Sequence, residues 1–277
     1  MSGERSWLDR RGIEVTLAVS FLTRLPTRRL ENLAGVRIAD CIWVFPIVGL
    51  MAGACAALIF GIASDWLASP RIAALLAIAF TIFFTGALHE DGLADFADGI
   101  GGGRTRERKL EIMRDSRIGT YGALALLVSV LLRVESLATL NWFPAAGALM
   151  AVHCVSRALM ALPFLLLSPA RADGLSQAAG RPGWLPVAFA GVLAILVLAQ
   201  LVPGGLAYSP IAGFDQLPAC GPVIVGAAGL AAALVICVIA RRYLGGHTGD
   251  VFGAAQQAAE VVMLVAISAV VRASLST

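Results

Sequence analysis

Four acidic residues lie close together in the segment His-Glu-Asp-Gly-Leu-Ala-Asp-Phe-Ala-Asp-Gly at residues 89–99. Asp91, Asp95 and Asp98 are spaced i, i+4 and i+7, so on an α-helix they share an arc of about 60° on one face. Neighbouring carboxylates repel each other, and a hard divalent cation such as Mg²⁺, which prefers oxygen ligands, removes that repulsion. We therefore predict that Asp91, Asp95 and Asp98 are Mg²⁺ ligands.

Acids elsewhere in the chain could complete such a site. The face from Asp91 to Asp98 spreads its ligands over about 10 Å, which suits two ions better than one. We predict further ligands at Glu90 and Asp250 and keep Asp115 as a candidate. Asp250 follows Gly-Gly-His-Thr-Gly and precedes an apolar run, so its alternative role is that of a helix N-cap.

His89 stands directly before the acids and is a candidate base. Histidine side chains titrate near neutral pH, which suits removal of a proton from an attacking hydroxyl group. The alternative is a histidine hydrogen-bonded to the backbone at a helix end. We predict catalytic roles for His89, Asp91 and Asp95.

Glycines and then arginines follow the acids. Gly101 and Gly102 would let the backbone approach a phosphate, although such glycines equally end a helix. Arg114 and Arg117 lie where the chain turns back towards the next apolar run, and a guanidinium group fits phosphate oxygens. The order of acids, glycines and arginines predicts a diphosphate substrate bound by these four residues. We expect Arg106, in the same stretch, to lie on a solvated helix.

The composition predicts an integral membrane protein. Of the 277 residues, 58% are hydrophobic and 14% are charged, whereas a soluble domain carries about 25% charged residues. The net charge of +3 gives no reason to expect nucleic acid as a partner.

Apolar runs long enough to cross a bilayer, about 20 residues each, recur along the chain. They lie at residues 42–63, 72–89, 118–140, 144–167, 184–203, 221–240 and 252–271. We predict an all-α polytopic bundle of about seven transmembrane helices, within a range of about six to eight. The shorter stretch 13–25 predicts an interfacial or re-entrant helix. We expect residues 1–277 to form a single membrane-embedded domain.

Positive charge is unevenly shared among the segments that join these runs. The N-terminal segment and residues 90–117, 168–183 and 241–250 hold most of the Arg residues. Because cytosolic loops are enriched in Lys and Arg, we predict that the N-terminus and the acidic segment face the cytosol. The other Arg-rich segments would lie on the same side of the membrane.

Ionisable residues also occur within the apolar runs. They are Arg133, Glu135, His153, Arg157 and Glu260. Such residues are costly in a bilayer, so we expect each to face the bundle interior or a polar cavity. They either fix the bundle through interhelical hydrogen bonds or line a cavity for a large substrate, and we favour the first role.

The segments around the acids resemble those of a known family. Residues 89–103 and Arg-Glu-Arg-Lys-Leu-Glu-Ile-Met-Arg-Asp-Ser-Arg-Ile-Gly-Thr-Tyr-Gly at 106–122 closely resemble the cobalamin synthase family, also called adenosylcobinamide-GDP ribazoletransferases. Supporting matches are Phe-Leu-Thr-Arg-Leu-Pro (21–26), Phe-Pro-Ile-Val-Gly (45–49) and Thr-Gly-Asp-Val-Phe-Gly-Ala (248–254).

The resemblance implies a Mg²⁺-dependent transferase of the bacterial inner membrane that acts late in cobalamin biosynthesis. Adenosylcobinamide phosphate would pass from adenosylcobinamide-GDP to α-ribazole or α-ribazole 5′-phosphate, with release of GMP. Asp91, Asp95 and Asp98 match the acidic motif of the family, which implies that they are metal ligands. The implied partners are these substrates and the lipid bilayer, and a homo-oligomer or contact with other cobalamin-assembly enzymes stays open.

Two other functions stay open on the sequence. A CDP-alcohol phosphotransferase that makes phospholipid would carry an Asp-Gly-x-x-Ala-Arg pattern, but position 95 is Asp. A cation-coupled transporter could use the intramembrane acids and Arg/His pairs as an ion path. Transporters place such charges near mid-membrane, often in two related halves, whereas these acids cluster at one end of a run.

Overall fold

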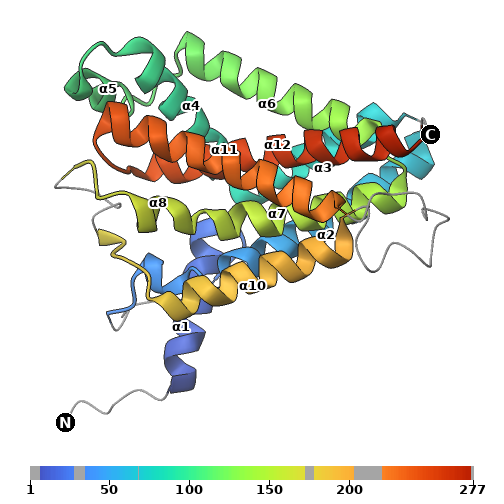
Figure 1. Cartoon of the computed structure of the whole chain (residues 1–277), viewed down its shortest axis with the longest axis horizontal. Helices are drawn as coiled ribbons and strands as arrows, with labels where there is room; N and C mark the ends of the chain where they lie inside the picture. The colour runs from blue at the N-terminus through green and yellow to red at the C-terminus, as the bar shows by residue number, and fades with distance from the viewer. Residues whose placement is uncertain (1–6, 28–34, 68, 172–177, 203–219, 276–277) are drawn as a thin grey trace.

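The computed structural model describes residues 7–27, 35–67, 69–171, 178–202 and 220–275, and this part of the chain is α-helical (Figure 1). The first half contains α1 (Trp7–Leu22), the 3₁₀ turn η1 (Ile38–Cys41), α2 (Phe45–Leu67), α3 (Pro70–Thr85), α4 (Leu88–Gly102) and α5 (Arg106–Ile112). The second half contains α6 (Thr120–Ala138), α7 (Trp142–Leu159), α8 (Ala161–Leu166), α10 (Trp184–Leu201), α11 (Gly221–Leu244) and α12 (Gly249–Leu275). The predicted all-α class is confirmed.

The number of candidate membrane spans agrees with the predicted range. Among the described residues, six helical segments are long and apolar enough to cross a bilayer: α2, α6, α7 with α8, α10, α11 and α12. The helices α3 and α4 make a seventh candidate if they are taken together, although they are bent by 89° at their junction.

The bend between α3 and α4 corrects the predicted continuous run 72–89. Helix α3 ends at Thr85, and Gly86 and Ala87 then both adopt left-handed backbone angles, with φ of 66° and 57°. A left-handed residue ends an α-helix, and glycine takes this conformation without steric cost. The chain therefore starts a new helix at Leu88, and the acids lie on α4 rather than at the end of α3.

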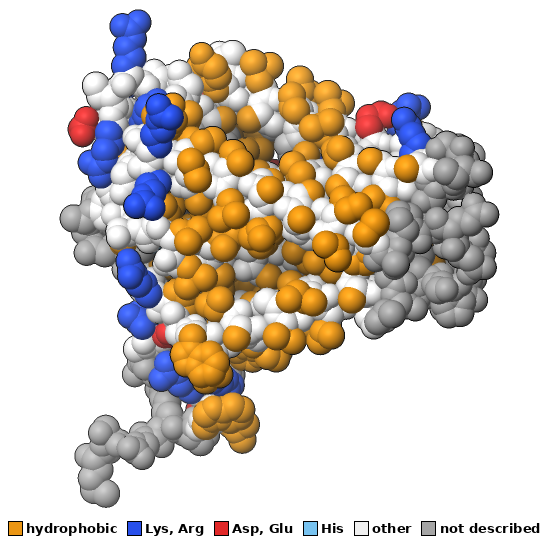
Figure 2. Space-filling model, in the orientation of Figure 1, with side chains coloured by type: hydrophobic (Ala, Val, Ile, Leu, Met, Phe, Trp, Pro, Cys, Tyr) orange, Lys and Arg blue, Asp and Glu red, His pale blue; other side chains and the backbone are white. Residues whose placement is uncertain are grey.

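The long helices lie side by side in one bundle (Figure 1). Helix α2 packs along α7, α11 packs along α12, and α4 packs against both α12 and α6. Helix α1 runs across the direction of the bundle at one end. Figure 2 shows that most Lys and Arg side chains on this face gather at that same end, beside a broad apolar surface.

Candidate active site

Two glycines let α4 and α12 approach closely. A Cβ atom on Gly92 would stand 3.1 Å from Gly253 Cα and 3.1 Å from the carbonyl oxygen of Asp250, and a Cβ on Gly253 would stand 3.1 Å from Gly92 Cα. Larger residues at either position would push the helices apart. The close contact brings Asp250, at the start of α12, to the acidic helix.

Four aspartates meet at this helix pair, and we call Asp91, Asp95, Asp98 and Asp250 the aspartate cluster. Asp91 is exposed, Asp95 and Asp250 are partly buried, and Asp98 is buried. The other three carboxylates all lie close enough to Asp95 to interact with it electrostatically. The structure thus brings together all the predicted aspartate ligands except Asp115.

The donor chemistry of the aspartate cluster suits a hard divalent cation, because every side-chain donor is a carboxylate oxygen. The side chains are not gathered into a complete coordination shell: within the described ranges, no group of three or more His, Cys, Asp or Glu side chains is arranged to hold a metal ion. Mg²⁺ binding therefore stays a prediction that the donor types support.

Asp98 has a contact that the sequence reasoning missed. Its Oδ2 accepts the backbone N–H of Gly119 at 2.7 Å, and its Oδ1 accepts that of Gly122 at 2.9 Å. These N–H groups lie at the start of α6, so Asp98 caps that helix from another helix. A Cβ atom on Gly119 or on Gly122 would clash with this carboxylate, so the contact needs glycine at both positions.

Asp250 is not an N-cap, because α12 begins at Gly249 and Asp250 lies within its first turn. Its Oδ2 accepts a hydrogen bond of 3.0 Å from Thr248 Oγ1. Arg171 lies close enough to interact with the carboxylate electrostatically, and its guanidinium donates to the carbonyl of Leu110 at 2.5 Å. Arg171 is a cation near the site that the sequence did not single out.

The turn before Asp250 is fixed by backbone pairing. The N–H of His247 donates to Ser168 O at 2.8 Å, and the carbonyl of His247 accepts from Ala170 N at 2.9 Å. The His247 ring packs edge-on against Phe164 and Phe252. Burial lowers the pKa of His247 to about 4, so the neutral ring is the form that packs here.

The two predicted phosphate-binding arginines lie in the connection from α5 to α6. Arg117 is 85% exposed in its side chain and pairs with Asp115, with Nη2 2.7 Å from Oδ2. This ion pair lowers the pKa of Asp115 to about 2. Arg114 lines a surface hollow together with Arg108 and Glu111. Asp115 therefore bonds to Arg117 outside the aspartate cluster, and the substrate-binding roles of both arginines stay predictions.

The predicted glycines lie in the last turn of α4. The ring of Tyr121 occupies the space beside Gly101, where a Cβ atom would stand 2.6 Å from it. A Cβ on Gly102 would stand 3.3 Å from Ile112 Cδ1. These contacts explain both glycines by packing, and no observation tests a role in phosphate binding.

Two cations of α5 donate hydrogen bonds to backbone carbonyl groups outside α5. Lys109 is buried, and its Nζ donates to the carbonyls of Ile100 and Gly103 at 2.6 Å each, at the end of α4. Arg106 donates to Leu244 O at 2.7 Å and to Ala170 O at 2.6 Å. Arg106 is exposed on α5, as expected for a solvated helix, but its guanidinium also binds the carbonyl of Leu244 where α11 ends. The sequence did not predict that contact.

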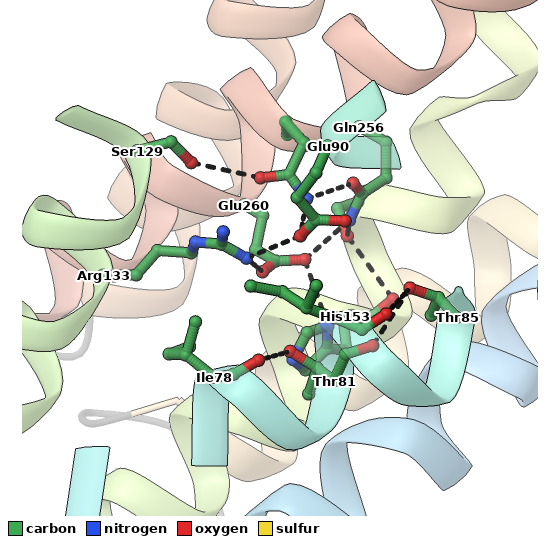
Figure 3. A network of polar contacts seen from close by, with 12 residues as sticks. Ile78, Thr81, Thr85, Glu90, Ser129, Arg133, His153, Gln256 and Glu260 are labelled. Atoms are coloured by element: carbon green, nitrogen blue, oxygen red, sulfur yellow. Dashed lines mark hydrogen bonds and ion pairs between the residues drawn. The ribbon is translucent and has the colours of Figure 1, made fainter. Parts of the chain in front are cut away.

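A buried polar network lies on the inner side of α4 (Figure 3). Its members, which we call the buried network, are Glu90, Arg133, His153, Arg157, Gln256, Gln257 and Glu260. Arg133 is fully buried, and its Nη1 lies 3.2 Å from Glu90 Oε1 and 3.1 Å from Glu260 Oε1. The network joins α4, α6, α7 and α12, as favoured for the intramembrane ionisable residues.

Two predicted residues lie differently from expectation. Glu135 does not face the interior: it is exposed and pairs with Arg71 at 2.9 Å, because two residues turn an α-helix by about 200° and so place Glu135 opposite Arg133. Glu90 is turned into the buried network towards Arg133 rather than standing on the exposed face with Asp91.

His89 also lies on the inner side of α4. It is 1% exposed and within electrostatic range of Arg157 and Glu260. Asp91, two positions further along, is exposed. The predicted role of His89 as a base is untested, and its burial separates it from the exposed part of the aspartate cluster.

Comparison with known proteins extends the resemblance to nearly the whole chain. The family model for cobalamin-5-phosphate synthase matches residues 14–268. The adenosylcobinamide-GDP ribazoletransferase of Bradyrhizobium diazoefficiens is 45% identical over 92% of this chain and 93% of its own length. Proteins with the same name from Rhizobium etli and Mesorhizobium japonicum are 40% and 41% identical, over 92% of this chain and 96% and 92% of their own lengths. No solved structure matches. The chain therefore belongs to the cobalamin-5-phosphate synthase family.

Proposed function

We propose that the chain transfers adenosylcobinamide phosphate from adenosylcobinamide-GDP to α-ribazole or α-ribazole 5′-phosphate and releases GMP. The family match over residues 14–268 and the names of the relatives support this reaction. The same matches count against the two alternatives, a CDP-alcohol phosphotransferase and a cation-coupled transporter.

The structural observation that carries the proposal is the aspartate cluster at the contact of α4 and α12. A diphosphate substrate cannot approach several carboxylates without a cation between them. We propose that Asp91, Asp95 and Asp250, with the remaining lone pairs of Asp98, hold Mg²⁺. Bound there, Mg²⁺ would neutralise the diphosphate and the departing GMP. Glu90, also predicted as a ligand, is left out because Arg133 already pairs with its carboxylate.

The protein itself positions the substrates and accepts a proton. The hydroxyl oxygen of the acceptor forms a bond to the phosphorus on the cobinamide side, and the bond from that phosphorus to the bridging oxygen of GMP breaks. We assign uptake of the hydroxyl proton to a carboxylate oxygen of the aspartate cluster that is not bound to the metal, because Asp91, Asp95 and Asp250 are the exposed or partly exposed acids at the site. His89 is buried on the other side of the helix.

We also propose that the basic end of the bundle faces the cytosol of a bacterial inner membrane. Most Lys and Arg side chains on the face seen in Figure 2 lie at that end. The positive-inside rule supports this orientation, and with it a cytosolic position for the aspartate cluster.

The test is an assay of GMP release by the purified protein with adenosylcobinamide-GDP, α-ribazole and Mg²⁺. We expect excess chelator to abolish release, and Asp91→Asn to reduce it by about 10²-fold or more while the protein stays folded. Asp65→Asn, at an exposed aspartate in α2 outside the cluster, is the matched control and should keep wild-type activity. Full turnover in chelator, or by Asp91→Asn, would refute the assignment.

A further inference from the structure

We propose that Arg133 is a positioning residue that sets the spacing of the aspartate cluster from inside the bundle. The proposal rests on the proposed function, because it takes the cluster as the reactive site. Arg133 touches none of the four aspartates in the contacts described above. It acts through the two glutamates that it holds.

The geometry of the Arg133 contacts ties together the two helices that carry the cluster. One nitrogen of Arg133, on α6, lies 3.2 Å from Glu90 on α4 and 3.1 Å from Glu260 on α12. Glu90 directly precedes Asp91 in the chain. Glu260 follows Asp250 by ten residues, about 15 Å along the same helix. A shift of Arg133 therefore shifts α4 relative to α12, and with them the carboxylates that face each other.

Helix α6 holds α4 at two places. Near the start of α6, the N–H groups of Gly119 and Gly122 bind Asp98. Further along α6, Arg133 binds Glu90, eight residues before Asp98 on α4. These two attachments fix both the position and the tilt of the acidic helix, because a single contact would leave α4 free to pivot.

The remaining members of the buried network hold the two glutamates. Gln257 Nε2 donates to Glu90 Oε1 at 3.0 Å. Gln256 Nε2 donates to Glu260 Oε2 at 2.6 Å, and His153 Nδ1 lies 3.0 Å from the same oxygen. Glu260 is therefore bound by residues of α6 and α7 at once (Figure 3). Because Glu260 is fixed in this way, its contact with Arg133 fixes the position of Arg133 and, through it, that of Glu90.

Stability alone does not account for this arrangement. A buried ion pair is often no more stabilising than apolar residues of the same volume, because desolvation opposes the attraction. In the described part of the chain, Arg133 Nε and Nη2 and Glu90 Oε2 are buried without a hydrogen-bond partner. Both ion pairs of Arg133 use the same atom, Nη1, so the position of one nitrogen sets the distance between Glu90 and Glu260.

The experiment compares Arg133→Lys with Arg71→Lys. Both changes keep the positive charge and remove the guanidinium, but Arg71 lies in an exposed pair with Glu135. The lysine ammonium lies one atom nearer the backbone than Arg133 Nη1, which stands 3.2 Å from Glu90 and 3.1 Å from Glu260. It therefore does not reach the same position between the two helices. Metal binding is measured by electron paramagnetic resonance of free Mn²⁺, which takes the oxygen ligands that Mg²⁺ takes. Thermal unfolding is measured in chelator.

We expect Arg133→Lys to keep the wild-type unfolding temperature within a few degrees and to raise the dissociation constant for Mn²⁺ about tenfold or more. The Mg²⁺ concentration for half-maximal GMP release should rise by a similar factor. Arg71→Lys should leave both quantities at wild-type values. Unchanged Mn²⁺ affinity in a folded Arg133→Lys protein overturns the proposal.

A second variant decides the question if Arg133→Lys does not fold. Gln257→Leu leaves every charge in place and removes the hydrogen bonds of Gln257 with Glu90, Gln256 and Ser129. A smaller rise in the Mn²⁺ dissociation constant is expected, and no rise overturns the proposal. A wild-type protein that neither binds Mn²⁺ nor needs Mg²⁺ refutes the proposed function instead. If the wild type needs Mg²⁺ but the variants bind Mn²⁺ with the wild-type dissociation constant, only the positioning role is refuted.

Discussion

Asp98 offers the sharpest test of how the site is built, because it is a predicted metal ligand and also a cap for α6. Its two oxygens accept N–H bonds of 2.7 Å and 2.9 Å from Gly119 and Gly122. In Asp98→Asn only one oxygen remains, so one N–H group faces an amide NH₂ that cannot accept its proton. The variant therefore loses stability even when no metal is bound.

The size of the loss follows from two contributions. A hydrogen bond to a charged group contributes about 1.5–3 kcal/mol. The interaction of a partly buried negative charge with a helix N-terminus contributes up to about 2 kcal/mol. These effects overlap, so we expect Asp98→Asn to lower the free energy of unfolding by about 2–4 kcal/mol.

The assay is equilibrium or thermal unfolding of the detergent-solubilised protein in excess chelator. Asp91→Asn is the matched control, because it makes the same change at an exposed position of the same helix, and it should change stability by less than about 0.5 kcal/mol. If Asp98→Asn unfolds like the wild type in chelator, Asp98 does not cap α6, and the attachment of α4 to α6 described here is wrong.

Three further outcomes are expected. Gly92→Ala places a Cβ atom 3.1 Å from Gly253 Cα, so α4 and α12 must separate by a few tenths of an ångström; the rate of GMP release should fall about tenfold with little change in unfolding temperature, and wild-type turnover would contradict this. The pKa of His247 is about 4 in the folded protein against about 6.5 unfolded, so the unfolded state binds more protons and stability falls by up to about 3 kcal/mol as the pH drops from 6.5 to 4. Unfolding of His247→Phe across this range should lack that part of the pH dependence, and equal slopes would count against it. Ala87→Gly relieves the left-handed backbone at φ 57° and should raise stability by up to about 1 kcal/mol, whereas a loss would mean that the bend is held differently.

The sequence predicted the helical class, the range of membrane spans and the shared helix face of the three aspartates. The spacing of Asp91, Asp95 and Asp98 on one helix, and the number of apolar runs, follow from helix geometry and hydropathy alone. The return of Asp250 to the same acids also agreed with expectation, because the charge of the connecting segments had already assigned both to one end of the bundle.

The sequence could not predict contacts between residues far apart along the chain. Arg133 and Glu135 are equally costly in an apolar run, and only the packing of α6 against its neighbours decides that the first is buried and the second exposed. Lys109 and Arg106 bind carbonyl groups at the ends of α4 and α11, which lie outside α5. No pattern within α5 reveals those partners.

The bend at Gly86 and Ala87 explains how a charged site can border an apolar bundle. Had α3 continued straight, Asp91 and Asp98 would lie about 9–20 Å beyond Thr85 along the axis of α3. The 89° turn instead lays α4 against α6 and α12. Two adjacent residues of α4 then lie in different environments. Glu90 contacts Arg133 inside the bundle, and Asp91 is exposed. The acidic helix thus links the buried network to the aspartate cluster, because Glu90 and Asp91 are adjacent residues. For this reason a change at Arg133 should alter the affinity of the cluster for the proposed metal, although Arg133 contacts none of the four aspartates.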